Sequence, residues 1–144
     1  MDQAGFQPFE ELEHPADISL RVYGDDLAAL FRHAAQGMFH LLRCRADDDP
    51  DSSEPVTEEI VLQAHDVETL LVDWLTELLY LSETRQACFD TFDLTHIDPT
   101  HLKAVVRGVS PARAEKDIKA VTYADMSITR NDDDHYTTTI TFDV

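Results

Sequence analysis

The sequence is poor in glycine, with only four in 144 residues. A loop that cradles phosphate through backbone N–H groups needs several glycines close together, so a glycine-rich nucleotide site of this kind is excluded. The patterns GxGxxG, GxxxxGK[ST], HExxH and GxSxG are also absent. The chain therefore carries none of the common enzyme signatures.

Long apolar runs are missing as well. No stretch of about 18 apolar residues occurs, so we expect no membrane span. The first five residues, MDQAG, lack the basic and apolar regions of a secretory signal, and we expect a cytoplasmic protein. Cys44 and Cys88 show no CxxC spacing. In a reducing compartment they are expected as buried or half-buried thiols, with a disulfide as the less favoured alternative.

Basic residues are scarce. Eleven Lys and Arg face 29 Asp and Glu, the net charge is −18, and only Lys103, Lys116 and Lys119 are lysines. One interpretation is an acidic surface that binds a basic partner or cations. We favour a solvated surface that keeps the protein soluble at high salt, as in a halophilic organism. Without a basic face interleaved with aromatics, no direct nucleic-acid binding is expected.

Two helices are predicted from apolar residues that recur with a period of about 3.6. The first spans about 26–43, after Gly24-Asp25-Asp26, where an aspartate is the expected N-cap. The second starts at the N-cap Asp66 and ends near Thr84. Between them, residues 45–55 are acidic and aperiodic, which indicates a surface loop.

The remaining segments alternate with period two, as strands do. Pairs of strands at 88–94 with 102–109, and at 118–129 with 135–142, flank turn residues and read as hairpins; further strands are expected at 6–13 and around Ile18 and Ile60. Residues 1–144 should form a single layered α+β domain, with a mostly antiparallel sheet of about six to seven strands and two helices.

Three local features have candidate chemistry. Asp17 stands at a strand entrance, where an aspartate is commonly a turn-former. Lys119 is a rare lysine in a predicted strand, on the same face as Val121. The alternative is an edge-strand lysine whose only role is to prevent aggregation. Asp143 points off the core face, and its carboxylate and the α-carboxylate of Val144 repel unless a cation or lysine orders them. A frayed, solvated tail is the alternative.

Taken together, these places resemble the archease family. The matching stretches are HPADI at 14–18, the helix at 27–39, LVDWLTELLYL at 71–81, IKAVTY at 118–123 and FDV at 142–144. They occur in order over nearly the whole chain. Two positions depart from the family pattern: Pro15 replaces the usual threonine, and Ala124 stands where histidine is frequent.

The resemblance implies an accessory protein rather than an enzyme. It implies a partner, the RtcB-type RNA ligase of tRNA splicing, whose guanylylation from GTP and multiple turnover this protein would promote. It implies a metal site at Asp17, Asp143 and Val144, for calcium as first choice and magnesium or manganese as alternatives, and an essential role for Lys119. A phosphate-transferring partner needs metal ions to neutralise charge, which agrees with such a site.

Two rival functions remain open at this stage. One is a calcium-binding, chaperone-like module with several protein clients. The other is a metal-dependent hydrolase that uses Asp17 and Asp143 with His14 as its base. The hydrolase is disfavoured because no nucleophile or phosphate cradle accompanies these residues.

We expect the protein to need salt in order to fold, because the net charge of −18 is self-repulsive until counterions screen it. Circular dichroism measured against KCl concentration should show the native signal growing with salt. A native signal already complete in dilute buffer would contradict this expectation.

Overall fold

Two helices begin at aspartate N-caps. The computed structural model describes residues 8–13, 17–46, 52–123 and 126–144, and the helices are α1 (Leu27–Leu42) and α2 (Val67–Arg85). The Oδ1 atom of Asp26 accepts the N–H of Ala29 at 2.8 Å, and that of Asp66 accepts the N–H of Thr69 at 2.7 Å. These bonds satisfy donors that the first helical turn leaves open, and the Thr69 N–H lowers the pKa of Asp66. Both predicted helix starts are confirmed.

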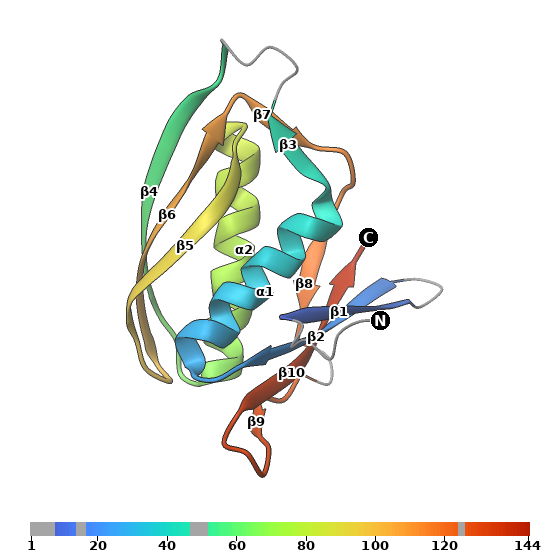
Figure 1. Cartoon of the computed structure of the whole chain (residues 1–144), viewed down its shortest axis with the longest axis vertical. Helices are drawn as coiled ribbons and strands as arrows, with labels where there is room; N and C mark the ends of the chain where they lie inside the picture. Colours follow the sequence, from blue (N-terminus) through green and yellow to red (C-terminus); the bar gives the residue numbers. More distant parts are fainter. Residues whose placement is uncertain (1–7, 14–16, 47–51, 124–125) are drawn as a thin grey trace.

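The helices lie between two sheets (Figure 1). A hydrogen bond joins the two helices: the indole N–H of Trp74 in α2, which is fully buried, donates to the carbonyl of Phe31 in α1 at 2.9 Å. A buried indole needs such a partner, because an unsatisfied donor in an apolar interior is costly. The same core receives apolar side chains from both sheets.

The first sheet has five strands, with order β1-β2-β10-β8 and β9 beside β10. Its strands are β1 (Phe9–Glu13), β2 (Asp17–Gly24), β8 (Ala120–Thr122), β9 (Thr129–Arg130) and β10 (Tyr136–Asp143). All the pairings are antiparallel. Ile140 and Phe142 of β10 are fully buried, whereas Asp143 is exposed, which confirms the predicted faces of this strand.

The second sheet has three strands, in the order β4-β6-β5. Its strands are β4 (Glu54–Gln63), β5 (Cys88–Ile97) and β6 (His101–Ser110). At the predicted turn between β5 and β6, the Oδ1 atom of Asp98 accepts the N–H groups of Thr100 at 2.9 Å and His101 at 2.8 Å. The Thr100 N–H, together with the side chain of His96, holds the pKa of Asp98 well below its usual value.

A third sheet has two strands, and two predictions made for this region are wrong. It consists of β3 (Cys44–Ala46) and β7 (Ala112–Ala114). Residues 45–46 and 54–55 of the predicted acidic loop therefore belong to strands, with Pro55 on β4 at the edge of its sheet, where a missing N–H is tolerated. The prediction of free thiols is also wrong: Cys44 and Cys88 form a disulfide, with Cα atoms 5.6 Å apart. Sequence spacing could not show this, because the two residues meet only through the pairing of distant strands.

The predicted long strand at 118–129 is wrong in extent. Among its residues that the structure describes (118–123 and 126–130), only Ala120–Thr122 and Thr129–Arg130 are strands, and they pair separately with β10. Ile118 and Val121 are both buried although they are three positions apart, so period two does not hold here. Lys119 precedes β8 and is exposed, and it does not share the face of Val121 as predicted.

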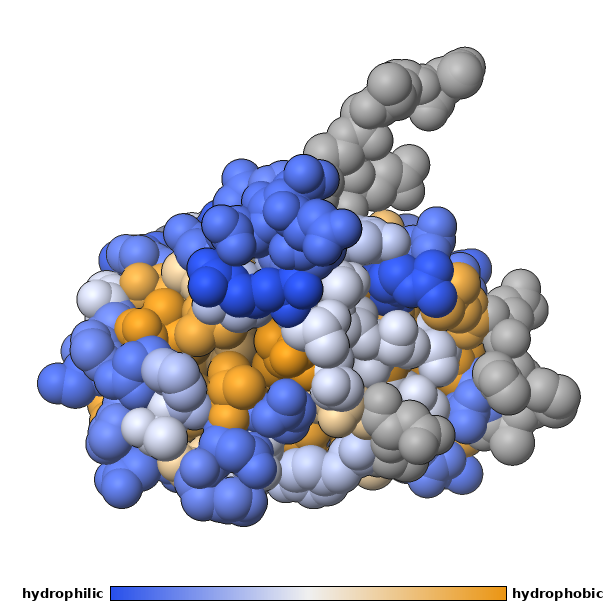
Figure 2. Space-filling view, turned by 90° about the horizontal axis from the view of Figure 1, so that it is seen from below, coloured by the Kyte–Doolittle hydropathy of each residue, from blue (hydrophilic) through white to orange (hydrophobic). Residues whose placement is uncertain are grey.

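The α+β class with two helices and antiparallel sheets is confirmed, although the strands of the described residues divide among three sheets. None of the described helices is long and apolar enough to cross a membrane. Figure 2 shows the underside of the molecule, where hydrophilic residues surround an apolar area.

We predict that the disulfide stabilises the native state. It closes a loop with a sequence separation of 44 residues, for which chain entropy gives at most about 4 kcal/mol. Urea unfolding of the double variant Cys44→Ser/Cys88→Ser should show a lower free energy of unfolding than the oxidised protein. Dithiothreitol should lower the stability of the wild type toward that of the variant and leave the variant itself unchanged. Equal stability of the variant and the oxidised wild type would contradict the prediction.

Candidate functional site

Two aspartates from opposite ends of the chain meet in the first sheet. Asp17 is the first residue of β2 and Asp143 is the last residue of β10. The antiparallel register places them directly opposite each other. Residues in such a pair have Cβ atoms about 4.5–5.5 Å apart and point to the same face. The structure thus brings together two of the residues that the sequence predicts for the metal site.

The face that carries the aspartates is the polar face of the sheet. Two residues further along each strand, Ser19 and Thr141 are also opposite each other, and their hydroxyl oxygens lie 3.0 Å apart in a hydrogen bond. Thr122 of β8 is opposite Thr141 on the other side. Its Oγ1 atom is buried and has no hydrogen-bond partner among the described residues. The aspartates therefore lie beside a row of hydroxyl groups that runs across three strands.

The aspartates differ in exposure. Asp143 is exposed, whereas Asp17 is half-buried and its Oδ1 atom is shielded from solvent. Like charges directly opposite each other in a sheet are destabilising. Burial strengthens this repulsion because fewer water molecules screen the Asp17 carboxylate. The pair is therefore a place where a cation would be stabilising.

Val144 follows Asp143 at the tip of the sheet. Its side chain is 41% exposed and lines a cavity with Ile18 and Ile118 on the inner side of the sheet. Its α-carboxylate adds a third carboxylate within one residue of Asp143. Strand pairing thus brings Asp17 beside Asp143, and Val144 is the next residue along the chain.

Lys119 approaches the site through its backbone. Its N–H donates to the carbonyl of Asp143 at 2.7 Å. The side chain is exposed and makes no ion pair with any carboxylate of the described residues. The fold therefore fixes the backbone position of Lys119, whereas its ammonium group extends into solvent.

The residues present fit a hard cation in part. Carboxylate oxygens are the ligands that calcium and magnesium prefer, and Asp17 and Asp143 supply them from one corner of the sheet. Within the described part of the chain, no three His, Cys, Asp or Glu side chains gather into a set that could hold a metal alone. Calcium takes about six to eight oxygens, so water or a partner protein must complete the coordination.

Tyr123, just beyond β8, is tied to α2. Its hydroxyl donates to Oδ1 of Asp73 at 3.4 Å, and the side chain is 55% exposed. Desolvation raises the pKa of Tyr123, and the negative charge of Asp73 raises it further. The hydroxyl therefore remains a neutral donor at neutral pH. His14, Pro15 and Ala124 lie outside the described residues.

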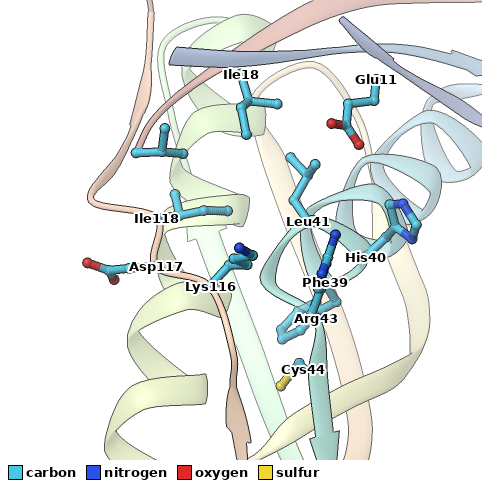
Figure 3. A pocket seen from close by; sticks show the side chains of 11 residues that line it. Glu11, Ile18, Phe39, His40, Leu41, Arg43, Cys44, Lys116, Asp117 and Ile118 are labelled. Atoms are coloured by element: carbon cyan, nitrogen blue, oxygen red, sulfur yellow. The ribbon is translucent and has the colours of Figure 1, made fainter. Parts of the chain in front are cut away.

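A cavity beside the site was not predicted from the sequence. It has a volume of about 600 Å³ and lies between the end of α1, the segment before β8, and strands β1 and β2 (Figure 3). Arg43 and Lys116 line it, as do apolar side chains. Only the scarcity of lysine could have drawn attention to Lys116, and no local pattern could have placed it beside Arg43.

The comparisons with known proteins agree over nearly the whole chain. The model of the Archease protein family (MTH1598/TM1083) matches residues 9–144. Protein archease of Methanosarcina acetivorans is 34% identical over 133 residues, which cover 87% of this chain and 88% of that protein. Protein archease of Sulfurisphaera tokodaii is 31% identical over 144 residues, covering 96% and 99%.

Two solved structures share the fold. The solution structure of protein 1598 from Methanobacterium thermoautotrophicum superposes with a TM-score of 0.64 at 27% identity, covering 95% of this chain and 99% of that one. The crystal structure of a Thermotoga maritima archease, described as a possible chaperone, has a TM-score of 0.65 at 19% identity, covering 94% and 96%. The second likeness concerns the fold alone.

We predict that removing one charge of the aspartate pair stabilises the protein in the absence of metal. With EDTA present, Asp143→Asn should raise the free energy of unfolding by roughly 0.2–1 kcal/mol, because it removes a like-charge cross-strand pair. Calcium chloride at constant ionic strength should stabilise the wild type more than the variant. Urea unfolding measures both effects.

The matched control is Asp132→Asn, which removes the same charge in the exposed turn before β10. It should respond to calcium as the wild type does. Equal responses of the wild type and Asp143→Asn would remove Asp143 from the metal site.

Proposed function

The chain belongs to the archease family, and from this membership we propose that it is an accessory protein that activates an RtcB-type RNA ligase. The activation would act on the transfer of guanylate from GTP to the ligase and on its multiple turnover in tRNA splicing, in the cytoplasm. The protein would contribute side chains to its partner's reaction and perform no reaction alone.

The observation that carries this proposal is the pairing of Asp17 with Asp143 at an exposed corner of the sheet. A cation held there keeps coordination positions open, because the chain supplies only part of the oxygen ligands. An open, protruding site suits a protein that presents a metal to another protein's active site. A site serving only stability would be closed by its own chain, as structural metal sites usually are.

The residues that would hold the metal are Asp17, Asp143 and the α-carboxylate of Val144. A divalent cation bound there supplies positive charge that neutralises phosphate oxygens during nucleotidyl transfer. The protein's own contribution is orientation. β2 and β10 fix both aspartates from rigid strands, and the Ser19–Thr141 hydrogen bond braces the two strands next to them.

Lys119 has two candidate roles: to hold the carboxylates in place, or to contact phosphate. The absence of an ion pair between Lys119 and the carboxylates of the described residues favours the second role. An exposed ammonium is a compact point charge that can follow a phosphate on a partner or substrate. Its backbone bond to Asp143 places that charge at the same corner as the metal ligands.

A calcium-binding, chaperone-like module with several clients is the second candidate. It rests on the description of the Thermotoga maritima archease as a possible chaperone, and that protein is similar to this chain in fold. Affinity capture from a native lysate separates the two functions. One RNA ligase as the dominant partner supports activation, whereas many unrelated proteins support the chaperone.

The decisive experiment measures label transfer from radioactive GTP to the cognate ligase, with ligase in excess over the added protein. We expect wild type to accelerate the transfer and to support multiple turnover of ligation. Asp143→Ala and Lys119→Ala should retain the native circular dichroism spectrum and lose most of the acceleration, because each removes a group at the tip without removing a buried contact.

Asp132→Ala and Lys103→Ala are matched controls, since they remove one charge of the same kind at exposed positions elsewhere. Both should activate as the wild type does. If Asp143→Ala and Lys119→Ala also activate fully, the tip has no part in the function.

A further inference from the structure

The cavity of about 600 Å³ lies beside the carboxylate corner, formed by Asp17 and Asp143, and is lined by both apolar and charged side chains. Leu41 at the end of α1 and Ile118 before β8 are buried against the core, and Ile18 of β2 adds a half-buried side chain. Figure 3 shows these three side chains pointing toward one another across the cavity. The volume lies in the range of small-molecule sites, which are about 300–1,000 Å³ and mostly apolar with a few polar groups.

Two cations stand on one side of this interior. Arg43 follows α1 in the left-handed conformation, with φ 50°, and its N–H donates to the carbonyl of His40 at 3.1 Å. The N–H of Lys116 donates to the carbonyl of Leu42 at 3.0 Å. The backbone thus pins both residues to the same helix end, and their nitrogen atoms point into the cavity in Figure 3.

Neither cation is neutralised within the described part of the chain. Arg21, Arg45 and Arg85 each form an ion pair with a glutamate, whereas Arg43 and Lys116 have none. Only three of the 11 basic residues form an ion pair with another described residue, so what distinguishes Arg43 and Lys116 is that both line one cavity. Two like charges that face one space repel each other, and a bound anion between them would relieve the repulsion.

Two acidic residues and His40 also line the cavity. The carboxylate of Asp117 points away from the cavity, whereas that of Glu11 faces it from β1, opposite the two cations (Figure 3). The cavity therefore presents two cations at one side, an apolar middle and a hydrogen-bond acceptor at the other side. A ligand that matches it has an anionic head of about two charges, a flat apolar body and N–H donors at its far end.

We propose that this cavity binds a nucleoside monophosphate. The phosphate, with a charge of about −1.5 to −2 at neutral pH, lies between Arg43 and Lys116, where the guanidinium can hold it through two hydrogen bonds. The base lies against Leu41, Ile118 and Ile18, and its N–H donors face Glu11. Side chains rather than backbone N–H groups hold the phosphate, which agrees with a chain that lacks a glycine-rich loop. The inference is independent of ligase activation.

Isothermal titration calorimetry of the isolated protein tests the proposal, at one KCl concentration in which the protein is folded. The probes are guanosine 5′-monophosphate, whose base offers two adjacent N–H donors, inorganic phosphate and guanosine. We expect saturable binding of the nucleotide, at least about tenfold tighter than either fragment. Arg43→Gln and Lys116→Gln should each weaken it about tenfold or more, because each removes a charge-assisted hydrogen bond.

Arg43→Gln should preserve the fold at the end of α1. Gln86 caps α2 in the same left-handed conformation, with φ 50°, so glutamine is an accepted residue at such a helix end. Lys103→Gln, on the exposed face of β6, is the control and should bind as the wild type does. The proposal is overturned if the nucleotide does not saturate by about 10 mM, if phosphate alone binds as tightly, or if both cavity variants bind normally.

Discussion

The pairing of β10 with β2 is the constraint on which the rest of the structure depends. It aligns Phe142 with Ile18 and Ile140 with Leu20 on the side that meets the helices. Since side chains alternate along a strand, burial of these residues forces Asp17 and Asp143 to the opposite face. A shift of register by one residue would bury the carboxylates and expose the apolar row. The hydrophobic effect on one face of the sheet therefore determines where charge is concentrated on the other.

Local patterns in the sequence predicted the helices and the faces of the longer strands. The N-caps Asp26 and Asp66 and the alternation through Ile140 and Phe142 follow from interactions within a few residues. Lys119 was misplaced because period two extends only over regular strand, and β8 is three residues long. The Cys44–Cys88 disulfide and the division into three sheets depend on contacts between distant segments, which no local pattern contains.

The carboxylate corner and the cavity occupy two faces of the same sheet end. Asp17 and Asp143 point outward, whereas their neighbours Ile18 and Val144 line the cavity on the inner side. Four separate segments must converge to build the cavity: the end of α1, the chain before β8, the paired strands β1 and β2, and Val144 after β10. The charged residues that line the cavity come from distant parts of the sequence, so the amino-acid composition gives no sign that they lie together. Only the folded chain brings these charged residues to one cavity.

The position of β10 late in the chain has a consequence for biosynthesis. The hydrogen bond between Ser19 and Thr141 joins residues 122 positions apart, and the ribosome makes β2 long before its partner. During translation one edge of β2 has no strand to pair with, while β1 can already cover the other edge. Such an open edge invites pairing with other chains. Contacts of this sequence separation also form slowly, because the intervening chain must be ordered first. The sheet that carries the site is therefore completed only after β10 has been synthesised.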